Sequence, residues 1–202
     1  MLLNPARSLD FMPAFPLGGE EIELVEETKL LGLIIRSDMS WVTNTEYMTK
    51  RGNSKLWMLR RLKVLGASQD DLVDVYFKQV RSILEFAVPV WHSSITNEER
   101  IELERIQKSA CYIILGDQYY SYTSALKQLG METLFSRRNK LCKKFARKSA
   151  KNEKFSTWFK VNKKETCTRT QQLKYCKVYS RTVRFDKSPI SYLTSILNNI
   201  KW

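Results

Sequence analysis

Apolar residues recur at helical spacing through most of the stretch from about residue 44 to about residue 150, and capping or turn-forming residues interrupt them at intervals. In a helix with 3.6 residues per turn, this spacing places apolar side chains on one face, which must pack against another element. Several such helices with short connections form a bundle. The sequence therefore predicts a mainly α-helical protein with a helical bundle at its centre.

Capping and breaking residues predict where these helices begin and end. Ser68-Gln69-Asp70-Asp71 resembles a capping box, with Asp in place of the preferred Glu, and Pro89 is expected to stop the helix that it opens. Asn97 is the expected N-cap of the next helix, and Gly116 its expected stop. The expected helices span about 44–64, 69–87, 97–116, 122–129, 133–150 and 190–200.

A small antiparallel β-hairpin is expected before the helices, within residues 20–42. Residues 21–24 alternate polar and apolar side chains, and residues 29–35 form a short apolar run, so both are predicted as strands. Residues 26–28 could turn the chain between them, and Gly32 would suit a bulge or a close backbone approach. Residues 1–19 contain three prolines and are expected to be irregular.

Positive charge is concentrated towards the C-terminus. Residues 133–187 include 18 Lys and Arg against three acidic residues, a net charge of +15, whereas the whole chain carries +13. The rest of the chain is therefore slightly negative, at −2. Such a basic stretch favours polyanions as partners, either nucleic acid or an anionic membrane surface.

Cysteine and histidine do not predict a metal site. The four cysteines, at positions 111, 142, 167 and 176, form no CxxC pair, and His92 is the only histidine. We expect no metal, no cofactor and no small-molecule substrate. No secretory signal is recognised in residues 1–19, and no stretch approaches the roughly 18 apolar residues of a membrane span. We therefore expect a reduced, intracellular protein of the nucleus or cytoplasm, without disulfides and not in a membrane.

Five sequence blocks follow one another over about residues 18–148. They are residues 29–35 (KLLGLII) with Trp41 downstream, 59–62 (LRRL), 82–91 (SILEFAVPVW), 103–116 (LERIQK to ILG), and 124–130 (SALKQLG) followed by Arg137-Arg138. In this order they resemble the part that follows the catalytic palm in reverse transcriptases of non-LTR retrotransposons of the jockey-like kind. The Pro-Val-Trp block is the most specific, and the last fifty residues match only loosely.

This resemblance implies a thumb-like helical bundle preceded by a primer-grip hairpin. It places Leu31, Gly32 and Leu33 at the primer grip, which supports the primer end, and the helix over 44–64 beside the template–primer duplex. Without a palm beside these residues, an ordinary buried strand is the favoured interpretation of residues 31–33. The resemblance divides the chain into residues 1–19, the hairpin at 20–42, the bundle at 43–150, and a less regular basic segment with aromatic residues at 151–202.

The chain departs from the family in its acidic residues. A reverse transcriptase binds two Mg²⁺ ions through palm aspartates, including a pair in a Tyr/Phe-x-Asp-Asp turn, and this sequence has no such turn. Its only Asp-Asp pair is Asp70-Asp71, which we interpret as the start of a helix. We therefore expect no catalytic residues, and no enzyme activity from this chain alone.

Two groups of basic residues are the candidate nucleic-acid contacts. They are Arg137, Arg138, Lys140, Lys143, Lys144, Arg147 and Lys148 in the helix over 133–150, and Lys50, Arg51 and Lys55 in the first helix. Cations on one helix face can contact several phosphates, and a nearly pure positive sign favours that role. The alternative for each group is an ordinary solvated helix face.

Other singled-out residues have structural interpretations. Phe86, Trp91 and Cys111 are expected in the core, and His92 is not expected to be catalytic. The aromatic residues interleaved with Lys and Arg over 155–185 could stack on single-stranded bases or pack a tail against the bundle. Three hypotheses remain open: a nucleic-acid-binding segment of a retrotransposon polymerase, a structural or protein-interaction module, and an unselected fragment of a mobile element.

Overall fold

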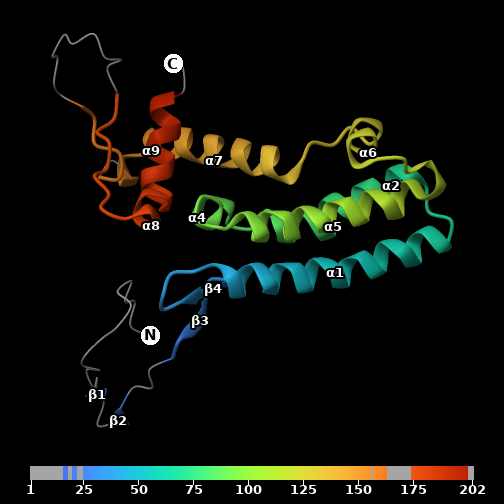
Figure 1. Cartoon of the computed structure of the whole chain (residues 1–202), viewed down its shortest axis with the longest axis horizontal. Coiled ribbons are helices and arrows are strands. Elements are labelled where there is room, and N and C mark those ends of the chain that lie inside the picture. Colours follow the sequence, from blue (N-terminus) through green and yellow to red (C-terminus); the bar gives the residue numbers. More distant parts are fainter. Residues whose placement is uncertain (1–15, 18–19, 22–24, 156, 163–173, 200–202) are drawn as a thin grey trace.

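The computed structural model describes residues 16–17, 20–21, 25–155, 157–162 and 174–199. The protein is mainly helical, with a small antiparallel hairpin before the helices, as the sequence predicts. In Figure 1, α1 (Val42–Val64), α5 (Asn97–Leu115) and α7 (Leu134–Ala150) run along the molecule, and α5 lies between the other two. Both α1 and α7 pack against α5.

Shorter elements connect and flank these long helices. A small pair of strands, β1 and β2, precedes the hairpin formed by β3 and β4. The π-helical turn η1 continues α2 into α3, while η2 and η3 are 3-10 turns. The bounds are β1 (Pro16–Leu17), β2 (Glu20–Glu21), β3 (Glu27–Leu30), β4 (Leu33–Arg36), α2 (Gln69–Val75), η1 (Tyr76–Arg81), α3 (Ser82–Leu84), α4 (Val88–Trp91), η2 (Gly116–Gln118), α6 (Tyr122–Gln128), η3 (Glu153–Phe155), α8 (Val183–Asp186) and α9 (Pro189–Asn199).

Side-chain caps explain where most of these helices begin. Ser68 Oγ accepts a hydrogen bond from the Asp71 N–H at 3.2 Å, so the Asp70-Asp71 pair opens α2 as predicted. The cap of α5 is Thr96 rather than Asn97. Thr96 Oγ1 accepts from the Glu99 N–H and Glu99 Oε2 accepts from the Thr96 N–H, which satisfies two otherwise unpaired helix donors.

The hairpin lies later in the sequence than predicted. The run at 29–35, predicted as one strand, contains the end of β3, a two-residue turn at Leu31 and Gly32, and most of β4. Both turn residues have positive φ, 48° and 86°, as the twist of a tight two-residue hairpin requires. Glu21 pairs with Pro16 in the separate β1–β2 pair, and residues 22–24, the rest of the predicted first strand, lie outside the described residues.

The helix predicted over 69–87 ends early and for a different reason than expected. Its last helical residue is Leu84, and Ala87 then adopts a left-handed backbone with φ of 49°. Pro89 does not stop this helix, because it lies in the first turn of α4, where its missing N–H costs no hydrogen bond. This break turns the chain so that α4 packs against α7.

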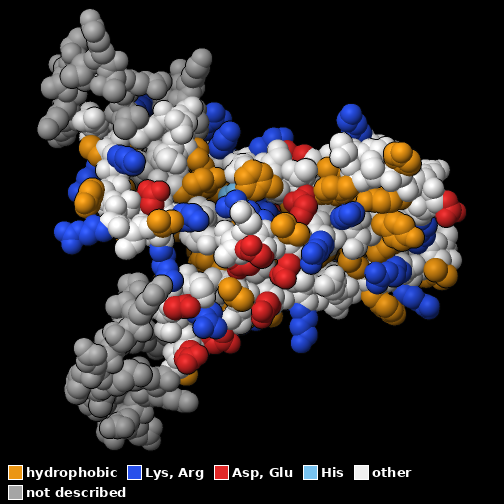
Figure 2. Space-filling model, viewed as in Figure 1, with side chains coloured by type: hydrophobic (Ala, Val, Ile, Leu, Met, Phe, Trp, Pro, Cys, Tyr) orange, Lys and Arg blue, Asp and Glu red, His pale blue; other side chains and the backbone are white. Residues whose placement is uncertain are grey.

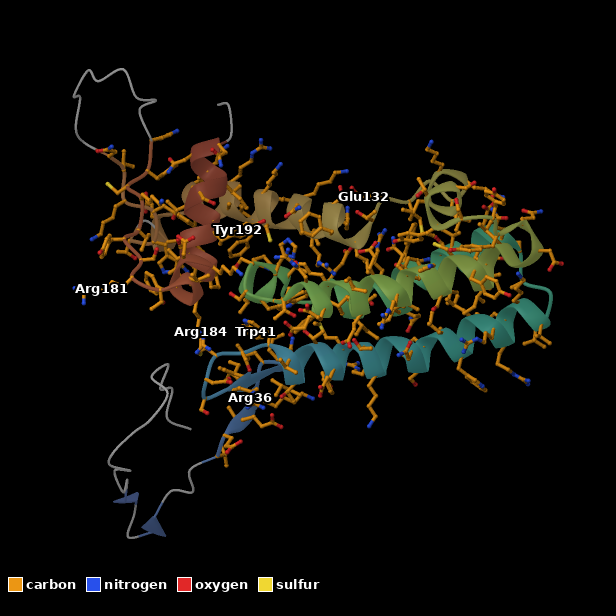
Figure 3. The ribbon with its side chains drawn as sticks, viewed as in Figure 1. Arg36, Trp41, Glu132, Arg181, Arg184 and Tyr192 are labelled. Carbon is orange, nitrogen blue, oxygen red and sulfur yellow. The ribbon has the colours of Figure 1, made fainter. Side chains whose placement is uncertain are left out.

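One hydrophobic core extends through the bundle and includes the C-terminal helix. Trp91, Tyr76 and Leu59 are fully buried, and Leu197 of α9 joins the same cluster. Cys111 is buried in this core, as predicted. In Figure 3, Arg184 of α8 lies close to the start of α1, where its Nη1 donates to the Asp38 carbonyl oxygen at 2.7 Å. None of the described helices combines the length and the hydropathy that crossing a membrane would need.

Candidate nucleic-acid interface

The face of α7 that points away from the bundle is almost entirely basic. Thr133 caps the helix, with its Oγ1 accepting from the Ser136 N–H at 3.1 Å. Leu134, Cys142 and Ala146 are buried on the inner face. The outer face carries Lys140, Lys143, Lys144, Arg147, Lys148 and, just beyond the helix, Lys151, all exposed. We call these six residues the α7 surface.

The six cations line a shallow depression of about 420 Å³ without any other side chain. Lys140 is paired, because its Nζ lies 2.6 Å from Glu132 Oε2. Over the described part of the chain, no carboxylate lies within ion-pair distance of Lys143, Lys144, Arg147 or Lys148. These four cations are therefore available to an external anion.

Arg137 is less available than the sequence suggested. Its Nε lies 3.0 Å from Glu85 Oε1, and the same oxygen lies 3.3 Å from Nε of Arg81. The Glu85 carboxylate is mostly buried, so the two arginines hold it between α7 and the preceding helical segment. Arg137 thus serves first to join two parts of the bundle.

Arg138 is not a surface residue, which corrects its assignment as a phosphate contact. It has no exposed area, and its guanidinium lies 5.7 Å from the centre of the Trp91 ring. None of its three nitrogens has a hydrogen-bond partner among the described residues. Burial lowers the pKa of Arg138 to about 10, so the group is still charged at neutral pH. The spacing could have revealed this position, because Arg138 lies four residues from both Leu134 and Cys142 on the inner face.

A second basic surface lies along α1. Lys50 and Arg51 are exposed, whereas Lys55 is half-buried. Two cations surround Tyr47: its hydroxyl accepts hydrogen bonds from Lys29 Nζ at 3.0 Å and from Arg51 Nη1 at 3.4 Å. The hydrogen bond from Lys29 lowers the pKa of Tyr47 below its ordinary value.

The sequence interpretation missed other parts of this surface. Trp57 is 63% exposed, and the Arg61 guanidinium lies 5.9 Å from the centre of its ring. Trp57 lies seven residues after Lys50 and four before Arg61, and this helical spacing, which places the three on one face, is the signal that could have identified it. We call Lys29, Tyr47, Lys50, Arg51, Lys55, Trp57 and Arg61 the α1 surface.

The residues predicted at the primer grip form the tip of the hairpin. Leu31 is 88% exposed, whereas Leu33 is buried in the core. A Cβ on Gly32 would lie 3.2 Å from Cε1 of Phe86, so this glycine allows the close approach that the sequence predicted. The turn borders a depression of about 380 Å³ that also includes Lys29, Tyr47 and Arg51. The three residues are thus not a continuous buried strand.

Two aromatic predictions for the 82–91 block have opposite outcomes. Trp91 is fully buried, and its Nε1 donates to the Phe86 carbonyl oxygen at 2.8 Å. Phe86 was also expected in the core, but it is 49% exposed, because the turn before α4 directs it towards the hairpin tip. His92 is buried with its Nε2 2.9 Å from Asn139 Oδ1, which supports a structural role.

The C-terminal aromatic residues differ in burial, and their stacking on bases stays a prediction. Phe159 and Tyr175 are buried, with ring centres 6.2 Å apart, and they pack this segment together. Trp158, Tyr179 and Phe185 stay at least partly exposed. Where the structure is described, no three His, Cys, Asp or Glu side chains gather closely enough to hold a metal ion.

The two basic surfaces do not form one site. Figure 1 shows α1 and α7 on opposite sides of α5, and Figure 2 shows Lys and Arg side chains at both long edges of the molecule. Comparison with known protein families, curated proteins and solved structures finds no match for this chain. Function must therefore be inferred from the surfaces themselves.

Proposed function

We propose that this chain is a thumb-like segment of a non-LTR retrotransposon reverse transcriptase, which holds nucleic acid and does not catalyse polymerisation by itself. The α7 surface is the observation that carries the proposal. Its four unpaired cations lie side by side on a rigid helix, with no acidic residue lining the depression between them. Surface cations are usually interleaved with acidic residues, so this arrangement favours an anionic partner.

The binding mechanism is electrostatic and largely indifferent to base sequence. Each phosphate neutralised by Lys or Arg releases condensed counterions, so the logarithm of the affinity falls with the logarithm of the salt concentration by about 0.9 for each contact on duplex DNA. Contacts from the four free cations of α7 would contribute a slope of about −3 to −4. Contacts to phosphates position a protein on a nucleic acid but do not specify its sequence.

Contacts between the sequence blocks that carry the family resemblance give further support. Glu85, in the block that ends Pro-Val-Trp, pairs with Arg137, while Trp91 of the same block lies beneath Arg138. The Arg137-Arg138 pair thus contacts the Pro-Val-Trp block, although about fifty residues separate them. This arrangement gives a physical reason for these residue types to occur together in one fold.

A gel-shift titration on a primer–template duplex tests the proposal. The test variant reverses Lys143, Lys144, Arg147 and Lys148 to Glu. It leaves Arg137 unchanged because this residue pairs with Glu85, and Arg138 unchanged because it is buried. The control reverses four exposed cations outside the two basic surfaces, namely Arg105, Lys108, Lys127 and Lys177. We expect the test variant to lose at least tenfold in affinity and about three to four units of its salt-dependence slope, and the control to lose much less. Equal losses in both variants would contradict a site on α7.

A protein-interaction module is the second candidate, and one apolar depression favours it. It measures about 730 Å³ and is lined by Trp158, which follows η3, and by residues from α4, α7, α8 and α9, including Phe145 and Ile190. Exposed apolar patches of this kind often mark protein contacts. In that case the wild-type protein would bind a protein partner without shifting nucleic acid, and Ile190→Asp would weaken the protein contact.

A further inference from the structure

The helices between the two basic surfaces carry exposed charges of both signs, including Arg105 and Lys108 on α5, so the positive surface is not continuous. Glu98 and Glu102 are exposed on α5, which lies between α1 and α7. Asp70, Asp71 and Asp74 are exposed on α2, which packs against both α1 and α5. Figure 2 shows acidic side chains, together with some Lys and Arg, between the two long edges of the molecule. An anionic strand that crossed from one basic surface to the other would meet these carboxylates on the way.

The distance between the surfaces also makes them electrically independent. Packed helix axes lie about 8–10 Å apart, and a helix with its side chains is about 10–12 Å wide. From the outer face of α1, across α5, to the outer face of α7 is therefore on the order of 30 Å. Charges on protein surfaces are screened over about 8 Å at physiological salt. Each surface thus attracts an anion without help from the other.

Each surface has its own complement of contacts. The α7 surface offers Lys143, Lys144, Arg147 and Lys148 on a single helix face. The α1 surface offers exposed cations from the hairpin and the helix, namely Lys29, Lys50, Arg51 and Arg61, together with the exposed ring of Trp57. Glu46 is the only acidic residue of α1, so this helix is also strongly basic. Neither surface needs residues of the other to contact several phosphates.

We propose that the two surfaces bind two separate nucleic-acid segments at the same time, so that one copy of the protein bridges them. This inference rests on the proposed function, because it requires the basic surfaces to bind nucleic acid. It adds that binding has two independent sites on opposite sides of α5. A reverse transcriptase thumb that only held its template–primer would need a single continuous surface.

A bridging assay tests this inference with the full chain. One RNA–DNA hybrid duplex is fixed to beads, and a second hybrid with a fluorescent label is in solution. We expect the wild-type protein to retain the labelled duplex on the beads.

Two variants each remove one surface. Variant A reverses Lys29, Lys50, Arg51 and Arg61 to Glu, and variant B reverses Lys143, Lys144, Arg147 and Lys148 to Glu. We expect each variant still to shift a single duplex through its remaining surface, more weakly than wild type and in variant B by at least tenfold, and to lose at least 90% of bridging.

Controls separate this inference from the proposed function and from self-association. Circular dichroism of both variants must show the wild-type helical signal, and a variant that fails this check is replaced by the corresponding Lys/Arg→Gln set. A mixture of variants A and B is expected not to bridge. If the mixture bridges like wild type, two copies of the chain bridge together and the inference is wrong.

If variant B abolishes all binding and variant A leaves bridging intact, α7 is the only site. The proposed function then stands and the inference is wrong. If no protein binds either duplex, both fall.

Discussion

The charge pattern of the sequence predicts the wrong environment for Arg138. It lies within a run of cations, and that context predicts a surface position, yet its place on the inner face of α7 decides its environment. Helical spacing from Leu134 and Cys142 carries the correct information, whereas the count of basic residues does not. The same spacing leaves Lys143, Lys144, Arg147 and Lys148 outside, where the structure also has them.

Replacing Arg138 with Met tests this interpretation. A buried charge without a hydrogen-bond acceptor gains little from its surroundings, so an apolar residue of similar shape is expected to raise the free energy of unfolding by about 1 kcal/mol or more. Because Arg138 has no exposed area, affinity for nucleic acid should stay within twofold of wild type. Urea denaturation and a gel shift measure the two effects, with Lys144→Met as the surface control. A loss of affinity greater in Arg138→Met than in Lys144→Met would show that Arg138 reaches the ligand.

His92 is expected to make stability depend on pH in mildly acidic solution. Burial, with smaller contributions from Arg138 and Arg100, lowers the pKa of His92 from 6.5 to about 4, despite the hydrogen bond to Asn139. The unfolded chain therefore binds a proton more readily than the folded one, and stability falls as the pH drops from about 6.5 towards 4. The loss amounts to about 3 kcal/mol at the lower end.

The measurement for His92 is the free energy of unfolding at a series of pH values between 7 and 4, for wild type and His92→Gln. His92 is the only histidine, so the variant removes this titration and keeps the contribution of the carboxylates. We expect the wild-type curve to fall more steeply than that of the variant. Parallel curves would mean that His92 is as easily protonated in the folded protein as in the unfolded chain.

At the scale of elements, the sequence predicts what local chemistry determines. The bounds of α6, α7 and α9 agree with prediction to within one or two residues, because Ser121 and Thr133 cap α6 and α7, and Gly130 follows α6. The apolar run at residues 29–35 wrongly predicts a single strand, because apolar residues continue through the turn between β3 and β4. A leucine at positive φ is rare, so nothing local indicates that the chain reverses at Leu31.

The contact between α1 and α5 depends on Gly52, which the sequence interpretation did not single out. A Cβ there would lie 3.0 Å from Cδ1 of Ile106, so the two helices approach closely at this point. Gly52→Leu would force the helices apart and is expected to lower the free energy of unfolding by about 1–3 kcal/mol. Ser54→Leu, two residues along on the exposed side, should change it by less than about 0.5 kcal/mol. Chemical denaturation followed by circular dichroism compares them, and equal stability of the two variants would contradict this packing.

At the scale of the whole molecule, the sequence could give the charge of each helix but not the side on which it lies. The sequence correctly predicts that the first helix (α1) and the helix at 133–150 (α7) are basic. Their separation by α5, however, depends on long-range packing. The C-terminal helix was predicted, but its packing was not. α9 lies against α7 and α4, and places Leu193 and Leu197 in the same core as α5.

This packing predicts that the chain unfolds as one cooperative unit. Leu197 is fully buried, so Leu197→Ala should lower the free energy of unfolding by about 2–5 kcal/mol through lost contacts and the cavity left behind. If α9 belongs to the same core, calorimetry will show a single transition at a lower temperature, with helix loss at 222 nm following the same curve. Ile190→Ala, on the same helix but 38% exposed, should shift the transition much less. A variant that lost α9 alone, in a separate early transition, would instead place this helix outside the unit formed by α1, α5 and α7.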